Sequence, residues 1–190
     1  MNLPNVLTLS RIVLAFFIVL LLMANTTAGF IAATVLFIVA SLTDFYDGHL
    51  SKKMGLTSDF GKIMDPIADK VLMLSVFGAL AHLGMIEWWM VIVIAVREIL
   101  VTVSRLKAVV VGQVLAAENM GKIKTVCQIA AIGVTMLFLI VEQSAFAVGW
   151  FYQVEPGWRS LINVFMVASV FFTVGSGIVY FRNTWERSLS

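Results

Sequence analysis

The chain has 190 residues, of which 61% are hydrophobic and 13% charged, and its mean hydropathy is +0.99. A soluble domain carries about 25% charged and about 45–50% apolar residues, so this composition excludes a disordered chain, a nucleic-acid-binding protein and an ordinary cytosolic enzyme. The net charge of +2 is too small to indicate a polyanionic partner, and the single cysteine, Cys127, cannot form an internal disulfide. We therefore expect one integral membrane domain, residues 1–190.

Six apolar stretches with few charges follow one another along the chain, and a membrane-spanning helix needs about 20 such residues. The first stretch follows Arg11 and resembles a signal peptide, but no clear Ala-x-Ala cleavage motif comes after it, so we expect it to be retained. The predicted fold class is all-α, with six transmembrane helices. Their predicted positions are residues 12–29, 30–47, 63–82, 87–110, 123–141 and 159–181.

The distribution of basic residues predicts the orientation in the membrane. Six spans place both termini on one side, and twelve of the 13 Lys and Arg residues fall on that side, which leaves Arg159 opposite. Cytoplasmic loops are rich in Lys and Arg, so both termini are predicted to be cytoplasmic. The small size and the lack of a targeting segment fit a bacterial plasma membrane. At the opposite membrane–water boundary we expect an aromatic belt, formed by Trp88, Trp89, Trp150, Tyr152 and Trp158.

Residues 43–70, which read TDFYDGHLSKKMGLTSDFGKIMDPIADK, contain two pairs of aspartates. Asp44 and Asp47 are three residues apart, and Asp65 and Asp69 are four apart, so on helices each pair projects from one face. The first pair ends the second predicted span and the second pair opens the third. An antiparallel pair of helices would therefore bring four carboxylates together near the cytoplasmic surface.

Four carboxylates that repel one another at a membrane surface are costly unless cations lie between them. Oxygen ligands without Cys or His favour Mg²⁺, Mn²⁺ or Ca²⁺ over Zn²⁺, and this many carboxylates are typical of two metal ions. Gly48 and Gly61 would let a ligand approach the backbone, and Lys52 adds a cation for phosphate oxygens. These residues predict a diphosphate site; the alternative is that the aspartates cap helices and pair with neighbouring lysines.

This segment resembles the signature of the CDP-alcohol phosphotransferase family, D-x2-D-G-x2-A-R-x8-G-x3-D-x3-D. The spacing agrees at every step, and the departure is Ser51-Lys52 in place of Ala-Arg. Lysine keeps the charge but lacks the planar fork with which arginine binds phosphate. The resemblance implies a six-helix fold, usually homodimeric, and a reaction that depends on divalent metal ions. The matching positions are Asp44, Asp47, Gly48, Ser51, Lys52, Gly61, Asp65 and Asp69.

The resemblance also implies roles for individual residues. The four motif aspartates would hold two Mg²⁺ or Mn²⁺ ions, and Asp69 would in addition act as the general base on the acceptor hydroxyl. CDP would be bound by motif residues beside these aspartates and by two residues near the N-terminus. These are Gly48, Ser51, Lys52, Gly61, Asn5 and Thr8.

Other stretches resemble the branch of the family whose acceptor is sn-glycerol 3-phosphate: residues 2–11 (NLPNVLTLSR), 97–105 (REILVTVSR), 121–125 (GKIKT) and 176–181 (SGIVYF). The implied reaction transfers the phosphatidyl group of CDP-diacylglycerol to that acceptor and yields phosphatidylglycerophosphate and CMP, a step of phospholipid biosynthesis. An anionic acceptor requires a basic pocket. The candidates are the cations on the cytoplasmic side: Arg105, Lys122, Lys124, Arg97 and Arg182.

Three alternatives stay open at this point. Arg97 lies deeper in its predicted span than the other candidates and could instead pair with Glu98 or with a motif aspartate. The acceptor could be inositol phosphate, serine, an amino alcohol or phosphatidylglycerol. The chain could also be a divalent-cation transporter, although transport sites tend to lie near the midplane between inverted repeats, and this chain shows no repeat.

Overall fold

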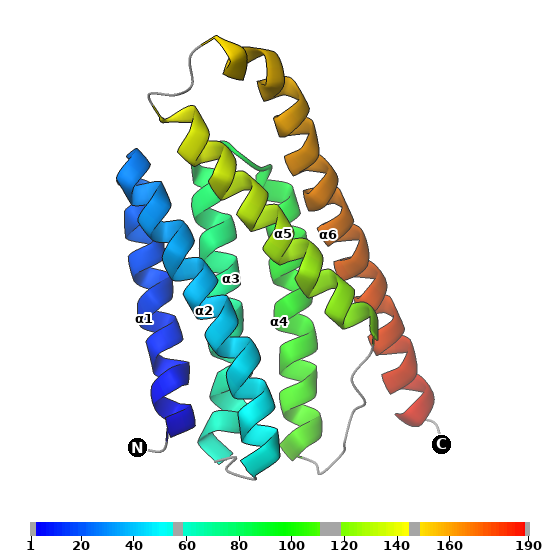
Figure 1. Ribbon diagram of the computed structural model, residues 1–190. Coiled ribbons are helices and arrows are strands. Elements are labelled where there is room, and N and C mark those ends of the chain that lie inside the picture. The colour runs from blue at the N-terminus through cyan, green and yellow to red at the C-terminus, as the bar shows by residue number, and fades with distance from the viewer. Residues whose placement is uncertain (1–2, 55–58, 111–118, 145–148, 189–190) are drawn as a thin grey trace.

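The computed structural model describes residues 3–54, 59–110, 119–144 and 149–188, and these ranges contain six α-helices and no strand (Figure 1). Side chains are placed at residues 9–43, 64, 66–107, 121, 123–144 and 149–184. The prediction of an all-α fold with six helices is confirmed. The helices are α1 (Leu3–Met23), α2 (Thr27–Met54), α3 (Asp59–His82), α4 (Trp88–Val110), α5 (Asn119–Glu142) and α6 (Trp150–Ser188).

Several helices are longer than the apolar stretches that predicted them. α2 continues to Met54 and α3 begins at Asp59, so most of the polar segment predicted to connect them is helical. α6 begins at Trp150 rather than at residue 159, and Pro156 lies inside it. Apolar composition indicates where a helix can lie in lipid, whereas a helix ends only where its backbone hydrogen bonds end. The predicted boundaries were therefore wrong at these polar ends.

Short turns join the helices at the end of the bundle farthest from the N-terminus. Asn25 has a positive φ of 49° at the end of α1, and Gly84 has a φ of 72° between α3 and α4. The backbone N–H of Gly29 donates to Oγ1 of Thr26 at 3.1 Å, which caps the first turn of α2. Thr27 also donates to the carbonyl of Gln143 at 2.8 Å, so the start of α2 is tied to the end of α5.

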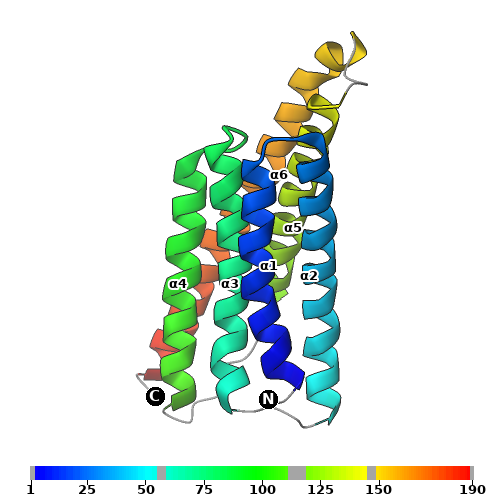
Figure 2. The same ribbon diagram turned by 90° about the vertical axis from the view of Figure 1, so that its left-hand side faces the viewer.

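α1 packs against α2 on one side and α3 on the other, and α5 packs most extensively against α6. α4 contacts α3 and α6, and α2 contacts α5 (Figure 2). The beginnings of α1 and α3 and the ends of α2, α4 and α6 all lie at one end of the bundle (Figure 1). We call this end, which holds Leu3, Met54, Asp59 and Ser188, the motif end.

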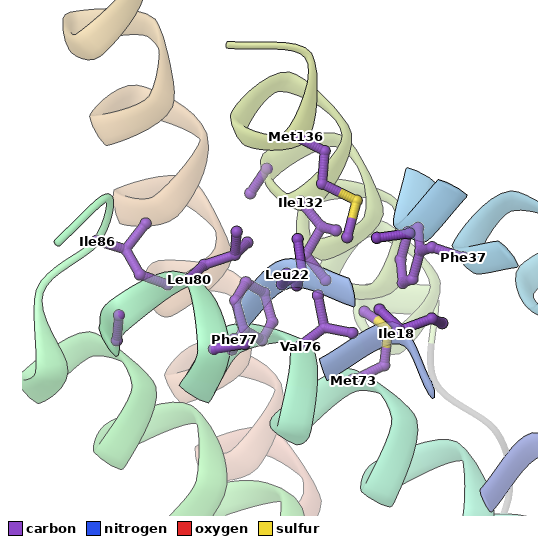
Figure 3. Close-up of a cluster of buried hydrophobic side chains, with 14 of the residues drawn as sticks. Ile18, Leu22, Phe37, Met73, Val76, Phe77, Leu80, Ile86, Ile132 and Met136 are labelled. Atoms are coloured by element: carbon purple, nitrogen blue, oxygen red, sulfur yellow. The ribbon is translucent and has the colours of Figure 1, made fainter. Parts of the chain in front are cut away.

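The centre of the bundle is a cluster of apolar side chains to which all six helices contribute, and Figure 3 shows part of it. Leu22, Phe77 and Met136 are fully buried within it. Large apolar side chains also cover the outside, since Phe16, Val126 and Phe171 are 63%, 66% and 68% exposed. Helices that are apolar all round are typical of a membrane or of the core of a large protein, and the apolar side chains exposed on the outside of this bundle favour a membrane.

Within the described residues, two helices are long enough and apolar enough to cross a membrane. They are Ile123–Glu142 and Trp150–Thr184, each with a mean hydropathy of 2.0. α1 and α2 contain shorter apolar stretches, Leu9–Met23 and Thr27–Thr43, while the apolar sequence of α4 is interrupted by four charged residues. The six transmembrane spans therefore stay a prediction, as does the cytoplasmic position of both termini.

A close contact at Gly29 yields a stability prediction. A Cβ atom added there would lie 2.6 Å from the carbonyl oxygen of Leu21, which is backbone and cannot swing aside. We expect Gly29→Ala to destabilise the protein in detergent by about 1–3 kcal/mol. The control is Gly133→Ala in α5, where nothing lies within 4 Å of the added atom. Thermal unfolding should show a lower Tm for the first variant only; equal Tm values would contradict the prediction.

Candidate functional site

The two halves of the acidic motif lie on two helices, α2 and α3, that both reach the motif end and both pack against α1. Asp44 and Asp47 belong to the last turns of α2, and Asp65 and Asp69 belong to the first turns of α3. The backbone is helical at all four positions, so each pair shares one helix face, as the spacing predicts. The side chains of the first three aspartates lie outside the described residues. Their convergence on metal ions therefore stays a prediction.

The residues predicted to bind CDP occupy the same region of the fold. Gly48, Ser51 and Lys52 follow the first aspartate pair on α2, and Gly61 precedes the second pair on α3. Asn5 and Thr8 lie in the first two turns of α1, which starts at the motif end and packs against both motif helices (Figures 1 and 2). The fold thus brings three separate segments to one end, while these six side chains lie outside the described residues.

Asp69 is the motif aspartate whose side chain is described, and it is linked to a second acid through a lysine. The carboxylate is 35% exposed, and its Oδ2 lies 3.1 Å from Nζ of Lys70. The same ammonium lies 3.0 Å from Oε2 of Glu98 on α4. One lysine therefore bridges the motif helix and a carboxylate on the neighbouring helix.

Glu98 is the centre of a largely buried group of polar side chains that we call the Glu98 cluster: Lys70, Arg97, Glu98, Lys124 and Ser176. Glu98 is only 3% exposed. Its Oε1 accepts hydrogen bonds from Arg97 Nη1, at 3.0 Å, and from Lys124 Nζ. Arg97 Nη2 donates to Oγ of Ser176 at 2.9 Å. The cluster therefore joins α3, α4, α5 and α6 at one point, which suits charges that must be paired where water is excluded.

The environment of Arg97 answers one of the questions left open by the sequence. Its pairing with Glu98, one of the two alternatives to a role in acceptor binding, is confirmed. Gly177 on α6 makes this arrangement possible, since a Cβ atom there would lie 3.2 Å from Cγ of Arg97. The glycine lets the arginine pass close to α6 and reach Ser176, the residue before it.

Arg105 lies nearer the motif end than the Glu98 cluster. It follows Glu98 by seven residues on α4, which places it on the same helix face about 10 Å farther along the axis. Its exposed guanidinium lies over the ring of Tyr180, 5.6 Å from the centroid. Tyr180 is 4% exposed, and its hydroxyl has no hydrogen-bond partner in the part of the chain that the structure describes.

The structure separates the five cations predicted to bind the acceptor. Arg97 and Lys124 are gathered around Glu98, and Arg105 lies beyond them toward the motif end. Arg182 is exposed on α6, two residues after Tyr180. The side chain of Lys122 lies outside the described residues. The cations therefore form an inner group held by an acid and an outer group that is exposed.

Sequence reasoning assigned no role to Ser176 or Tyr180. It considered Glu98 only as a possible partner of Arg97, and Lys70 only as one of the lysines that could pair with the motif aspartates. One signal was present, because an acid ten residues into an apolar helix is costly and therefore usually functional. A second signal lay in stretches 97–105 and 176–181. The contacts of Arg97 with Ser176 and of Arg105 with Tyr180 join these two stretches across α4 and α6.

Comparison with known proteins places this arrangement in a family. Residues 1–175 match the family model described as CDP-alcohol phosphatidyltransferase. The chain is 36% identical to the CDP-diacylglycerol–glycerol-3-phosphate 3-phosphatidyltransferase of Bacillus subtilis (strain 168), over 97% of this chain and 96% of that protein. It is 36% identical to a probable phosphatidylglycerophosphate synthase of Mycobacterium tuberculosis, over 94% of this chain and 79% of that protein. The chain belongs to the CDP-alcohol phosphatidyltransferase family.

Proposed function

We propose that this chain transfers the phosphatidyl group of CDP-diacylglycerol to sn-glycerol 3-phosphate and releases CMP. The observation that carries the proposal is the complete acidic motif, whose two halves lie on α2 and α3 at the same end of the bundle. Relatives named for this reaction align with nearly the whole chain. The product is phosphatidylglycerophosphate, so the reaction belongs to phospholipid biosynthesis.

The motif aspartates suit two divalent ions, Mg²⁺ or Mn²⁺, because their ligands are carboxylate oxygens. Asp69 supports this assignment. Lys70 contacts Oδ2 of its partly exposed carboxylate, and Oδ1 has no such contact with any described residue. Bound ions would neutralise charge on the diphosphate and on the leaving CMP. The four residues that would hold them are Asp44, Asp47, Asp65 and Asp69.

In the proposed reaction, the acceptor hydroxyl attacks the phosphorus atom of the phosphatidyl group. A new oxygen–phosphorus bond forms, and the bond between that phosphorus and the CMP oxygen breaks. Asp69 accepts the proton of the attacking hydroxyl, the role of a general base. Phosphoryl transfer depends mainly on positioning and electrostatics, so no cysteine, serine or histidine nucleophile is needed.

The two substrates bind on different sides of Asp69 in this proposal. Cytidine and the diphosphate lie between α1, α2 and α3, near Asn5, Thr8, Gly48, Ser51, Lys52 and Gly61. The acceptor phosphate enters from the motif end and first meets Arg105, which is exposed and backed by the Tyr180 ring. Lys122 and Arg182 supply further positive charge on this side, while Lys124 and Arg97 lie deeper and are paired with Glu98.

The proposed setting is a bacterial plasma membrane, which the six helices cross with the motif end on the cytoplasmic side, and the proposed assembly is a homodimer. The apolar side chains on the outside of the bundle support the membrane setting. The concentration of Lys and Arg on the side of both termini supports the orientation. A lipid substrate then reaches the site sideways from the bilayer, while the acceptor arrives from water.

The proposal is tested by CMP release from the purified protein in detergent, with CDP-diacylglycerol and Mg²⁺ or Mn²⁺. Glycerol 3-phosphate, inositol phosphate, serine and no acceptor are compared side by side. We expect release with glycerol 3-phosphate only, loss of release in EDTA, and recovery when either metal is added in excess. Release with a different acceptor would overturn the choice of acceptor. No release with any acceptor would overturn the reaction.

A further inference from the structure

A buried acid in the middle of α4 needs an explanation. Glu98 lies ten residues after Trp88, the first residue of the helix, which places it about 15 Å along the axis. A buried carboxylate loses its hydration and is tolerated where cations and hydrogen bonds replace the lost water. Glu98 meets this condition through Lys70, Arg97 and Lys124. Three cations are more than one carboxylate requires.

The surplus of cations lies directly beside the proposed catalytic aspartate. The five charged residues at this point, Asp69 and the charged members of the Glu98 cluster, have a net charge of +1. Lys70 lies between the two acids, 3.1 Å from the Asp69 carboxylate and 3.0 Å from that of Glu98. Within the described part of the chain, the cations of this cluster contact two carboxylates, that of Glu98 and that of Asp69.

The loss of Glu98 would therefore act on Asp69. Lys70 would keep one carboxylate partner instead of two, and Arg97 and Lys124 would lose the carboxylate that they share. The carboxylate that remains for these cations is that of Asp69, which already contacts Lys70. An ammonium or guanidinium bound there competes with a divalent ion for the same oxygens.

We propose that Glu98 is a positioning residue that holds Lys70, Arg97 and Lys124 and thereby keeps Asp69 available for metal binding. This inference deepens the proposed function and rests on it, since it takes Asp69 as a metal ligand. Glu98 itself touches neither the metal nor the substrates. It acts through Lys70, the residue that contacts both acids.

The test measures Mn²⁺ binding to the purified protein in detergent without substrates, by the electron paramagnetic resonance signal of free Mn²⁺. Glu98→Gln keeps the size of the side chain but removes its charge. We expect it to weaken Mn²⁺ binding about tenfold or more, as loss of a group that orients a metal ligand does. Glu98→Asp keeps the charge and should bind Mn²⁺ more tightly than Glu98→Gln.

A matched control exists at the other end of α5. Glu142 lies 3.2 Å from Nη2 of Arg159, so Glu142→Gln makes the same chemical change in another ion pair. It should leave Mn²⁺ binding within twofold of the unmodified protein. If Glu98→Gln lowers the Tm and leaves Mn²⁺ affinity unchanged, or if both variants weaken binding equally, the inference is overturned.

A double variant separates positioning from general disruption. Lys70→Met removes the cation that bridges the two acids, so Glu98→Gln combined with Lys70→Met should bind Mn²⁺ more tightly than Glu98→Gln alone. A cavity or a folding defect at position 98 would not be relieved in this way, and failure of the rescue would overturn the inference. The Mn²⁺ measurement does not depend on turnover, so absence of CMP release would disprove the proposed function alone.

Discussion

Asp69→Asn is expected to lower the rate of CMP release by about 10²- to 10⁴-fold, the usual contribution of a general base. Asparagine has nearly the shape of aspartate and keeps one carbonyl oxygen, but it cannot accept the proton of the acceptor hydroxyl. Lys70 keeps its second partner, Glu98, 3.0 Å away, so its position should change little. At a saturating concentration of metal, binding of CDP-diacylglycerol should be largely intact, because the amide oxygen and the other three motif aspartates can still hold the ions.

Two measurements on the same preparation check this expectation. CMP release with glycerol 3-phosphate reports turnover, and retention of radiolabelled CDP-diacylglycerol reports binding. Asp59→Asn is the control, because Asp59 begins α3 on the same helix but is not part of the motif; it should retain normal turnover. Near-normal turnover in Asp69→Asn would exclude Asp69 as the base.

The second large effect is expected from Arg105→Ala. A hydrogen bond between an arginine and a phosphate is charge-assisted, and its loss costs about 1.5–3 kcal/mol, or roughly 10- to 100-fold in affinity. We expect this increase in the KM for glycerol 3-phosphate, with little change in the KM for CDP-diacylglycerol. The side chain is exposed and lies over the buried Tyr180 ring, so its removal should affect the surface and leave the core intact.

Arg159 offers a control with similar local geometry. Its guanidinium also lies over an aromatic ring, that of Phe138, 4.9 Å from the centroid. It pairs with Glu142 and Glu155, far from the motif end. Arg159→Ala should leave both KM values unchanged. If Arg105→Ala raised the two KM values equally, Arg105 would not be part of an acceptor pocket.

The number and order of the helices could be predicted from the sequence because each contains an apolar stretch bounded by polar residues. The spacing of the motif aspartates likewise predicted their placement on two helix faces, since a helix repeats every 3.6 residues. The helix ends were less predictable. α2 continues through polar residues to Met54, and hydropathy cannot distinguish a helix that leaves the membrane from a loop.

The packing of the helices was not predictable in the same way. Helices that are apolar on all sides have no polar face to show which side packs against a neighbour. The position of α1 between α2 and α3 could therefore not be predicted from the sequence. The Glu98 cluster shows the same difficulty. Lys70 and Lys124 are 28 and 26 residues from Glu98 along the chain, and their meeting depends on how α3 and α5 pack beside α4.

The short apolar part of α2 has a consequence for the lipid around the protein. It runs from Thr27 to Thr43 and stops at Asp44, so it rises about 25 Å, whereas the hydrocarbon layer of a bilayer is about 30 Å thick. In the proposed membrane setting, a bilayer that matches α2 would become thinner there by about 5 Å. Headgroups on the side of the motif end would then descend toward the motif aspartates. A lipid diphosphate would reach the proposed metal site while its acyl chains stay in the membrane, which avoids about 0.8 kcal/mol for every methylene group that would otherwise be withdrawn.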